Sequence, residues 1–186
     1  MTLSILTFNF YPVTAIMIVL LALLNDGAIL SISYDRVKGS NKPEAWNMHL
    51  VFTLATILGF LGVVESFGLL YAGKHYLQMS NDVLQTLIYL KLSIAGHLTI
   101  FVTRTRGNFW TKKPSGILFF AVLITQLAAT FIAVYGLFMT PIGWKYAGLI
   151  WAYCIFWFIV EDFTKIFVYK FIVDGKTIWH HKMKWL

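Results

Sequence analysis

Five long apolar segments constrain this chain more than any other feature. Each has about the twenty apolar residues that a helix needs to cross a bilayer, at roughly residues 12–33, 48–72, 84–103, 116–138 and 148–168. Charged residues make up only 12% of the 186 residues, against about 25% in an ordinary soluble domain. We therefore predict an all-α integral membrane bundle of five transmembrane helices, forming a single transmembrane domain over residues 1–186.

The loops between these segments predict the orientation of the bundle. Twelve basic residues lie in loops 34–46 and 104–115 and in the tail from residue 165, and two lie in loops 73–83 and 139–147. Short loops rich in Lys and Arg stay in the cytoplasm, so we expect the N-terminus outside and the C-terminus inside. Residues 1–10 lack a basic region and a cleavage site of the signal-peptide type, and they resemble the end of a preceding hydrophobic helix.

Asp26 is the main candidate for a functional residue, because it lies inside the first apolar segment. A carboxylate at membrane depth is costly unless it is paired or hydrated. The neighbouring Gly27 permits an irregular backbone, so Asn25, Asp26 and Gly27 predict an ion site in a locally broken helix. The alternative is a buried Asp that is hydrogen-bonded to a neighbouring helix.

Three other polar positions within the segments have alternative interpretations. Lys91 either pairs with Asp26 or Glu65, or extends its amine to the interface. His97 lies six residues further along and could share a crevice with Lys91, either as a proton relay or as a neutral histidine bonded between helices. Glu65 lies either beside an ion pathway or near the outer interface.

The last segment contains Glu161 and Asp162. Asp162 and Lys165 are three residues apart and can touch on one helix, which predicts a structural ion pair. The single cysteine, Cys154, cannot form an intrachain disulfide. No grouping of His, Cys and carboxylate residues has metal-ligand spacing, no catalytic residues are identified, and no basic helix of the nucleic-acid-binding kind is present.

Several strings resemble the P-type plasma-membrane proton ATPases of plants, fungi and prokaryotes. They are LLNDGAILSISYDRVK at 23–38, FVTRTR at 101–106, QLAATFIAVY at 126–135, GLIWAY at 148–153 and DFTK at 162–165. The resemblance covers nearly the whole chain in order. It implies that the five segments correspond to pump helices six to ten, with residues 1–10 as the end of helix five.

The resemblance implies a role for Asp26 as the membrane aspartate that accepts and releases the transported proton. It also implies a location in the plasma membrane, with the lipid bilayer, the remaining pump helices and the cytoplasmic domains as partners. The phosphorylation string Asp-Lys-Thr-Gly-Thr of the family does not occur here. The sequence also lacks the nucleotide-binding and actuator domains of the family, so we expect the chain alone to be inactive as an ATPase. ATP and Mg would act only in the complete pump, and no cofactor is expected in this chain.

Two alternatives to a pump segment remain. The chain could be an autonomous small proton or cation transporter that uses the same bundle. It could also be a helical scaffold subunit that assembles with a partner and transports nothing.

Overall fold

The computed structural model describes residues 2–35 and 48–182, with side chains described through Phe171. Arg36, Lys38 and Lys42 of the predicted basic loop lie outside the described residues, and the side chains of Lys176, Lys182 and Lys184 lie beyond them. Every regular element in the described ranges is helical, as predicted. The elements are α1 (Thr2–Phe8), α2 (Ala15–Ser31), the 3₁₀ turn η1 (Ile32–Tyr34), α3 (Met48–His75), α4 (Asn81–Thr103), α5 (Gly116–Tyr135) and α6 (Gly143–Lys182).

Five helices of the described residues are long and apolar enough to cross a membrane, which confirms the predicted number. They cover Ala15–Tyr34, Met48–His75, Asn81–Thr103, Gly116–Tyr135 and Gly143–Phe171. The last begins five residues before the predicted boundary of 148, because the apolar pattern does not show that Gly143, at φ 70°, starts the helix. Residues 2–8 form a short helix of their own, followed by irregular backbone before α2.

Local sequence explains most of the helix boundaries. The Thr14 side chain accepts a hydrogen bond from the backbone of Met17 at the start of α2. The Ser115 side chain accepts one from Leu118 at the start of α5. Such caps satisfy backbone donors that the first turn leaves unpaired. Gly136 ends α5 with φ 74°, a left-handed conformation that glycine adopts without steric cost.

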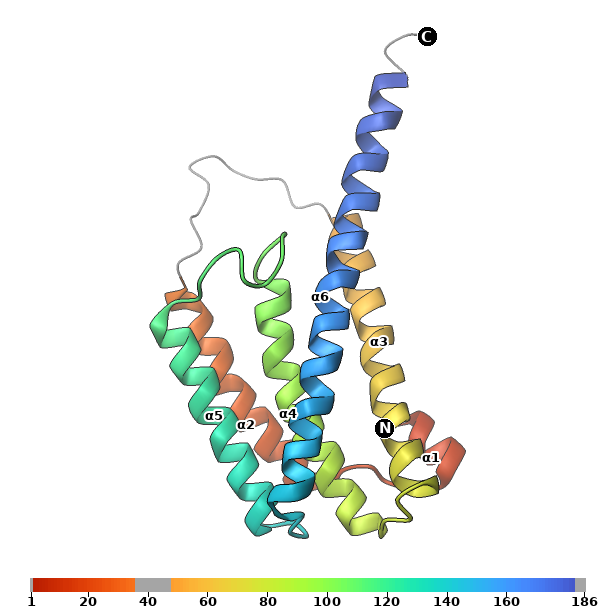
Figure 1. Cartoon of the computed structure of the whole chain (residues 1–186), viewed down its shortest axis with the longest axis vertical. Helices are drawn as coiled ribbons and strands as arrows, with labels where there is room; N and C mark the ends of the chain where they lie inside the picture. The colour runs from red at the N-terminus through yellow and green to blue at the C-terminus, as the bar shows by residue number, and fades with distance from the viewer. Residues whose placement is uncertain (1, 36–47, 183–186) are drawn as a thin grey trace.

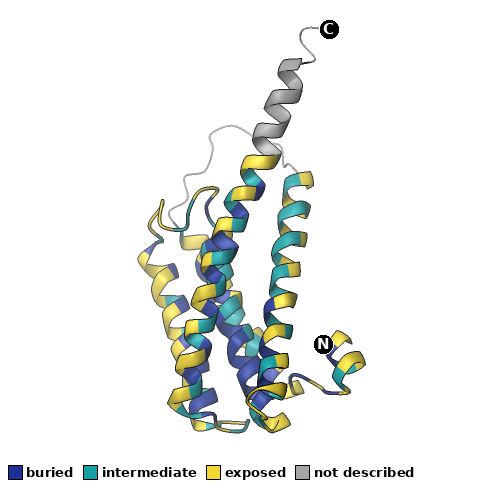
Figure 2. Cartoon of the chain, turned by 45° about the vertical axis from the view of Figure 1, so that its right-hand side comes forward, coloured by how far each residue is buried: buried dark blue, intermediate teal, exposed yellow. Residues whose placement is uncertain are grey.

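The long helices run alternately up and down, and α4 lies at the centre of the bundle (Figure 1). Within the most apolar stretch of each helix, 56% of the residues of α4 are buried, against 17% for α2 and 11% for α3. Figure 2 shows the same contrast, with the buried residues gathered on α4 and on the facing side of α6. A helix in the middle of a membrane bundle meets protein on every side, so it can carry polar groups that a lipid-facing helix cannot.

Two apolar clusters form the core. The larger joins the first half of α4 to the end of α5 and the start of α6, and includes Leu87, Ile94, Ala133 and Ile150. The smaller joins Ala28, Leu118 and Val122 toward the other end of the molecule. Between the clusters, the buried side chains of α4 are polar or charged: Lys91, Ser93 and His97.

Candidate functional site: charged groups within the membrane spans

Asp26 occupies the twelfth position of the 20-residue span Ala15–Tyr34, about halfway across the hydrocarbon core. Its side chain is exposed on the outer surface of the bundle. It makes no hydrogen bond or ion pair with residues 2–35 or 48–171. In a bilayer this outer surface meets lipid or other protein, so a charged Asp26 requires a partner or water from beyond the described part of the chain.

The expectation of a broken helix at Asp26 is wrong, because α2 is continuous from Ala15 to Ser31. The two neighbours of Asp26, half-buried Asn25 and exposed Gly27, lie close to other helices. A Cβ atom added at Gly27 would lie 3.6 Å from Cγ2 of Thr125, and one added at Gly96 would lie 3.8 Å from Oδ1 of Asn25. Small residues allow membrane helices to approach closely. Gly27 therefore serves the packing of α2 against α5 in this structure, while Asp26 lies on the exposed side.

Lys91 pairs with Glu65, and not with Asp26. Its Nζ lies 2.9 Å from Oε2 of Glu65, and the side chains are 2% and 1% exposed. The same amine donates to Oγ of Ser66 at 2.8 Å and to the carbonyl of Gly62 at 3.5 Å. The Tyr153 hydroxyl donates to the Glu65 carbonyl at 2.8 Å. This ion pair therefore joins α3 to α4, and α6 holds the backbone beside it.

A groove of about 740 Å³ lies beside this pair. Side chains of α3, α4 and α6 line it, and Thr2 and Leu3 of α1 contribute to it. Glu161 also lines the groove, with Oε2 lying 3.3 Å from Oγ1 of Thr99. Sequence reasoning noted Glu161 only as a neighbour of Asp162, because the spacing along one helix does not show which helices face it.

His97 faces a different side of α4 from Lys91. It is fully buried, with Nδ1 2.8 Å from the Ser93 carbonyl and Nε2 3.2 Å from Oγ1 of Thr125. The carbonyl only accepts, so Nδ1 carries a proton. The expected shared crevice with Lys91 is not present, because six residues of α-helix turn the two side chains about 120° apart. His97 instead bonds α4 to α5.

Asp162 and Lys165 lie together near the end of α4. Nζ of Lys165 is 2.6 Å from Oδ1 of Asp162 and donates to the Val102 carbonyl at 2.8 Å. The other carboxylate oxygen of Asp162 accepts from the backbone of Phe109 at 3.3 Å. Both side chains are almost completely buried. The pair holds α6 against α4 and the loop that follows α4.

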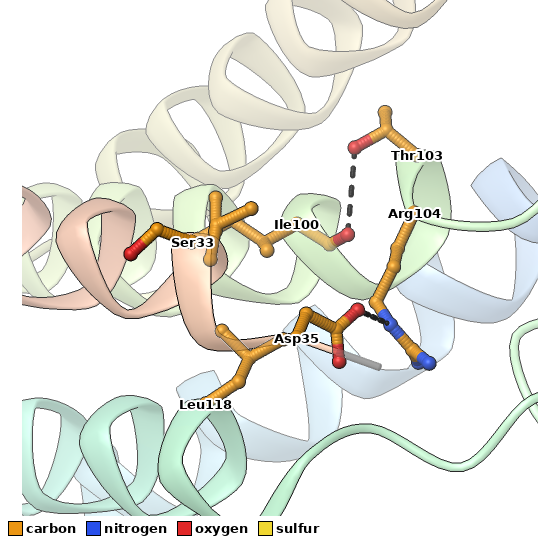
Figure 3. A pocket seen from close by; sticks show the side chains of 7 residues that line it. Ser33, Asp35, Ile100, Thr103, Arg104 and Leu118 are labelled. Carbon is orange, nitrogen blue, oxygen red and sulfur yellow. Dashed lines mark hydrogen bonds and ion pairs between the residues drawn. The ribbon is translucent and has the colours of Figure 1, made fainter. Parts of the chain in front are cut away.

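A third buried ion pair, between Asp35 and Arg104, was missed by sequence reasoning. Asp35 accepts from Nε of Arg104, and its other oxygen accepts from the backbone of Ser115 at 2.9 Å. Figure 3 shows the pair beside a cavity of about 410 Å³ that is also lined by Ser33 and Ile100. Both residues occur in strings of the family resemblance, 23–38 and 101–106, which was the available signal. The pair joins the ends of α2 and α4 to the start of α5.

These groups do not form a metal centre in the part of the chain that the structure describes. Within it, no three His, Cys, Asp or Glu side chains gather closely enough to hold a metal ion. The membrane charges instead fall into buried ion pairs, the polar groove and the exposed Asp26. Two acids described in the membrane spans are exposed: Asp82 lies in the first turn of its span, and Asp26 lies in the middle of its span.

Comparison with known proteins gives two informative relatives. A protein of Methanocaldococcus jannaschii that carries the name of a cation-transporting ATPase is 44% identical over 169 residues, which covers 90% of this chain and 21% of that protein. A protein of Dictyostelium discoideum that carries the name of a plasma membrane ATPase is 35% identical over an alignment of 206 residues, which covers 94% of this chain and 19% of that protein. No family model matches the chain.

The two relatives cover nearly all of this chain, whereas the chain spans about a fifth of the length of each of them. The aligned part of the chain includes most of its membrane-spanning helices. The chain is thus a multi-pass membrane protein homologous to ion-transporting ATPases, and the comparisons support the P-type ATPase family.

Proposed function

We propose that this chain is the membrane portion of an ATP-driven proton exporter, and that Asp26 binds the transported proton. The position of Asp26 carries this proposal. It lies midway along an apolar helix and is exposed on the bundle surface, with no partner among the described residues. Glu65, Glu161 and Asp162 have partners inside the bundle, and exposed Asp82 lies at the end of its span. Asp26 therefore faces the place where additional helices or a water path would meet this chain.

A proton suits this position better than a metal ion does. Hard metal cations take six or more oxygen ligands, and α2 offers one carboxylate, with the amide of Asn25 turned toward Gly96. A single carboxyl group is sufficient to carry one proton. Lys91 does not act as counter-ion of Asp26, because it is paired with Glu65.

Transport requires Asp26 to meet two environments. In one state its carboxyl group would take up a proton from the cytoplasm, and in the other it would release that proton outside. Nearby charge and exposure to water are the physical means of changing its proton affinity. A thousandfold change in that affinity corresponds to about 4 kcal/mol. In this proposal ATP-driven movement of the missing domains supplies that free energy by moving helices against the outer face of α2.

The proposed location is the plasma membrane, with the end that carries Arg104, Arg106, Lys112 and Lys113 in the cytoplasm. The loop between α4 and α5, which carries these residues, lies at one end of the bundle in Figure 1. The end of α3 and the start of α6, which carry Lys74 and Lys145, lie at the opposite end. This asymmetry supports the orientation expected from the loops.

The test is ATP-driven acidification by the complete protein or complex that contains this chain. The protein is reconstituted in vesicles with a pH-sensitive dye, and Asp26→Asn is compared with Asp82→Asn. Asp82 is an exposed acid in the first turn of α4, so it serves as a matched control. We expect Asp26→Asn to abolish acidification and Asp82→Asn to leave it unchanged. Full transport by Asp26→Asn would refute the proposed role and favour the scaffold alternative.

Two measurements on the chain alone separate the remaining alternatives. We expect it to hydrolyse no ATP, because the phosphorylation string of the family is absent from its sequence. We also expect no proton flux in vesicles under an imposed pH gradient. Proton flux without ATP that stops in Asp26→Asn would instead establish an autonomous transporter.

A further inference from the structure

The groove between α3, α4 and α6 contains one more acid than base. Its ionisable side chains among the described residues are Glu65, Lys91 and Glu161. All three are buried, at 1%, 2% and 6% exposure. If both acids were ionised, the groove would carry a net charge of −1 at membrane depth. An uncompensated buried charge is costly, and the usual response of such a group is to become neutral.

Lys91 has no hydrogen left for Glu161. A lysine ammonium has three N–H donors. In this structure they have three acceptors on α3: Oε2 of Glu65, Oγ of Ser66 and the carbonyl of Gly62. The positive charge is thus committed to α3, so Glu161 on α6 has no cation of its own in the groove.

The hydrogen bond of Thr99 indicates where the compensating proton lies. A threonine hydroxyl has a single hydrogen. Oγ1 of Thr99 lies 2.8 Å from the carbonyl of Ala95 and 3.3 Å from Oε2 of Glu161. The carbonyl can only accept, and it is the nearer partner, so it takes the hydroxyl hydrogen. The contact with Glu161 is then a hydrogen bond only if Glu161 supplies the hydrogen.

We propose that this groove is a second proton-binding site, in which Glu161 carries one proton and donates it to Oγ1 of Thr99 while Glu65 and Lys91 remain an ion pair. The proton comes from hydronium in the solvent, which is left as water, and it converts the Glu161 carboxylate to the carboxylic acid. Oε1 of Glu65, which is buried and has no hydrogen-bond partner among the described residues, is a free acceptor for a water or hydronium in the same groove. This proposal does not depend on the role of Asp26.

The direct test is infrared spectroscopy of the full chain in lipid nanodiscs at neutral pH. A protonated carboxyl group gives a carbonyl stretch that an ionised one lacks. All chains compared carry Asp26→Asn, so that Asp26 contributes no band. We expect the band in this parent chain, its loss when Glu161→Gln is added and a shifted band when Glu161→Asp is added. Lys91→Met should about double the intensity of the carbonyl band, because Glu65 loses its cation and then also takes up a proton.

A stability measurement gives an independent readout. If Glu161 is protonated when folded and ionised when unfolded, the native chain binds more protons, and its stability falls as the pH rises. Glu161→Gln imitates the protonated acid in shape and hydrogen bonding. It should therefore match the native chain in thermal stability below about pH 4, where a free glutamate is protonated, and be more stable than the native chain at neutral and alkaline pH. Circular dichroism and elution volume verify that each variant is folded.

Several experimental results would contradict the proposal. An Asp26→Asn chain without the carbonyl band, or a band that persists undiminished when Glu161→Gln is added to that chain, would overturn it. A folded Glu161→Gln chain with native pH dependence of stability would contradict it independently.

Discussion

Arg104 uses three guanidinium nitrogens to close one end of the bundle. Nε donates to Asp35 (Figure 3). Nη1 donates to the Lys112 carbonyl at 2.9 Å and Nη2 to the Lys113 carbonyl at 3.0 Å. The planar guanidinium group can serve all three acceptors at once, whereas the compact ammonium of a lysine cannot reproduce that geometry. At the scale of one residue, shape is therefore as important as charge here.

We expect Arg104→Lys to lower the free energy of unfolding by about 2 kcal/mol, since hydrogen bonds of a charged group contribute about 1.5–3 kcal/mol. Unfolding in mixed micelles measures the change. Arg106→Lys is the matched control because Arg106 is exposed in the same loop, and its effect should stay within about 0.5 kcal/mol. Equal effects of the two substitutions would refute the role of Arg104.

The buried pair of Asp162 and Lys165 permits a second prediction at this scale. Lys165→Met leaves the Asp162 carboxylate buried without its cation, and breaking such a pair costs about 3–5 kcal/mol. The double variant Asp162→Asn with Lys165→Met removes both charges and should recover much of that loss. Lys170→Met, on an exposed residue of the same helix, should have little effect. A double variant as unstable as Lys165→Met would contradict this explanation.

At the scale of the element, α4 is both the most buried span and the one that carries Lys91, Ser93 and His97 in its interior. Each of these three residues bonds to a neighbouring helix: Lys91 to α3, the Ser93 carbonyl to Gln126 of α5, and His97 to α5. Without such bonds these groups would be too costly in an apolar bundle. The polarity of α4 thus specifies which helices surround it.

The end of α5 gives a prediction for one element. Gly136 has φ 74°, and a Cβ there would lie 2.7–2.8 Å from atoms of Pro141 and Met139. Gly143 has φ 70° with nothing within 4 Å. A left-handed conformation costs a non-glycine residue about 1–2 kcal/mol. Gly143→Ala should therefore destabilise by that amount.

Gly136→Ala should cost at least about 1 kcal/mol more than Gly143→Ala, because crowding adds to the strain. Thermal unfolding of the two variants, measured side by side, gives the difference. A Gly136→Ala chain no less stable than Gly143→Ala would show that the connection between α5 and α6 rearranges freely.

At the scale of the whole molecule, the basic residues divide the bundle into two unlike ends. In a chain with native Cys154 replaced by Ala, a cysteine can be placed at exposed Lys112 or at exposed Lys145. In intact cells, we expect a membrane-impermeant maleimide to label Lys145→Cys and not Lys112→Cys, because the end rich in basic residues stays in the cytoplasm.

Labelling of both cysteines after permeabilisation provides the control for reactivity. The reverse pattern in intact cells would overturn the proposed orientation. It would also reverse the direction in which Asp26 is proposed to carry a proton.

The number and approximate limits of the spans could be predicted from sequence, because the bilayer requires about twenty apolar residues in each. The candidate Asp26 could be identified on the same ground, since a charge at membrane depth needs a reason. The resemblance to ATPases also came from strings in the sequence, and the comparisons support it at the level of ion-transporting ATPases. These are properties of one segment at a time.

Only the tertiary structure decided which charges meet. It paired Lys91 with Glu65, directed His97 toward α5, brought Asp35 to Arg104 and placed Glu161 in the same groove as Lys91. These partners lie on different helices, and helix periodicity sets the direction of a side chain without showing what lies opposite. The physical reason is that span formation depends on local transfer from water to lipid, whereas ion pairing depends on how separate helices rotate and pack.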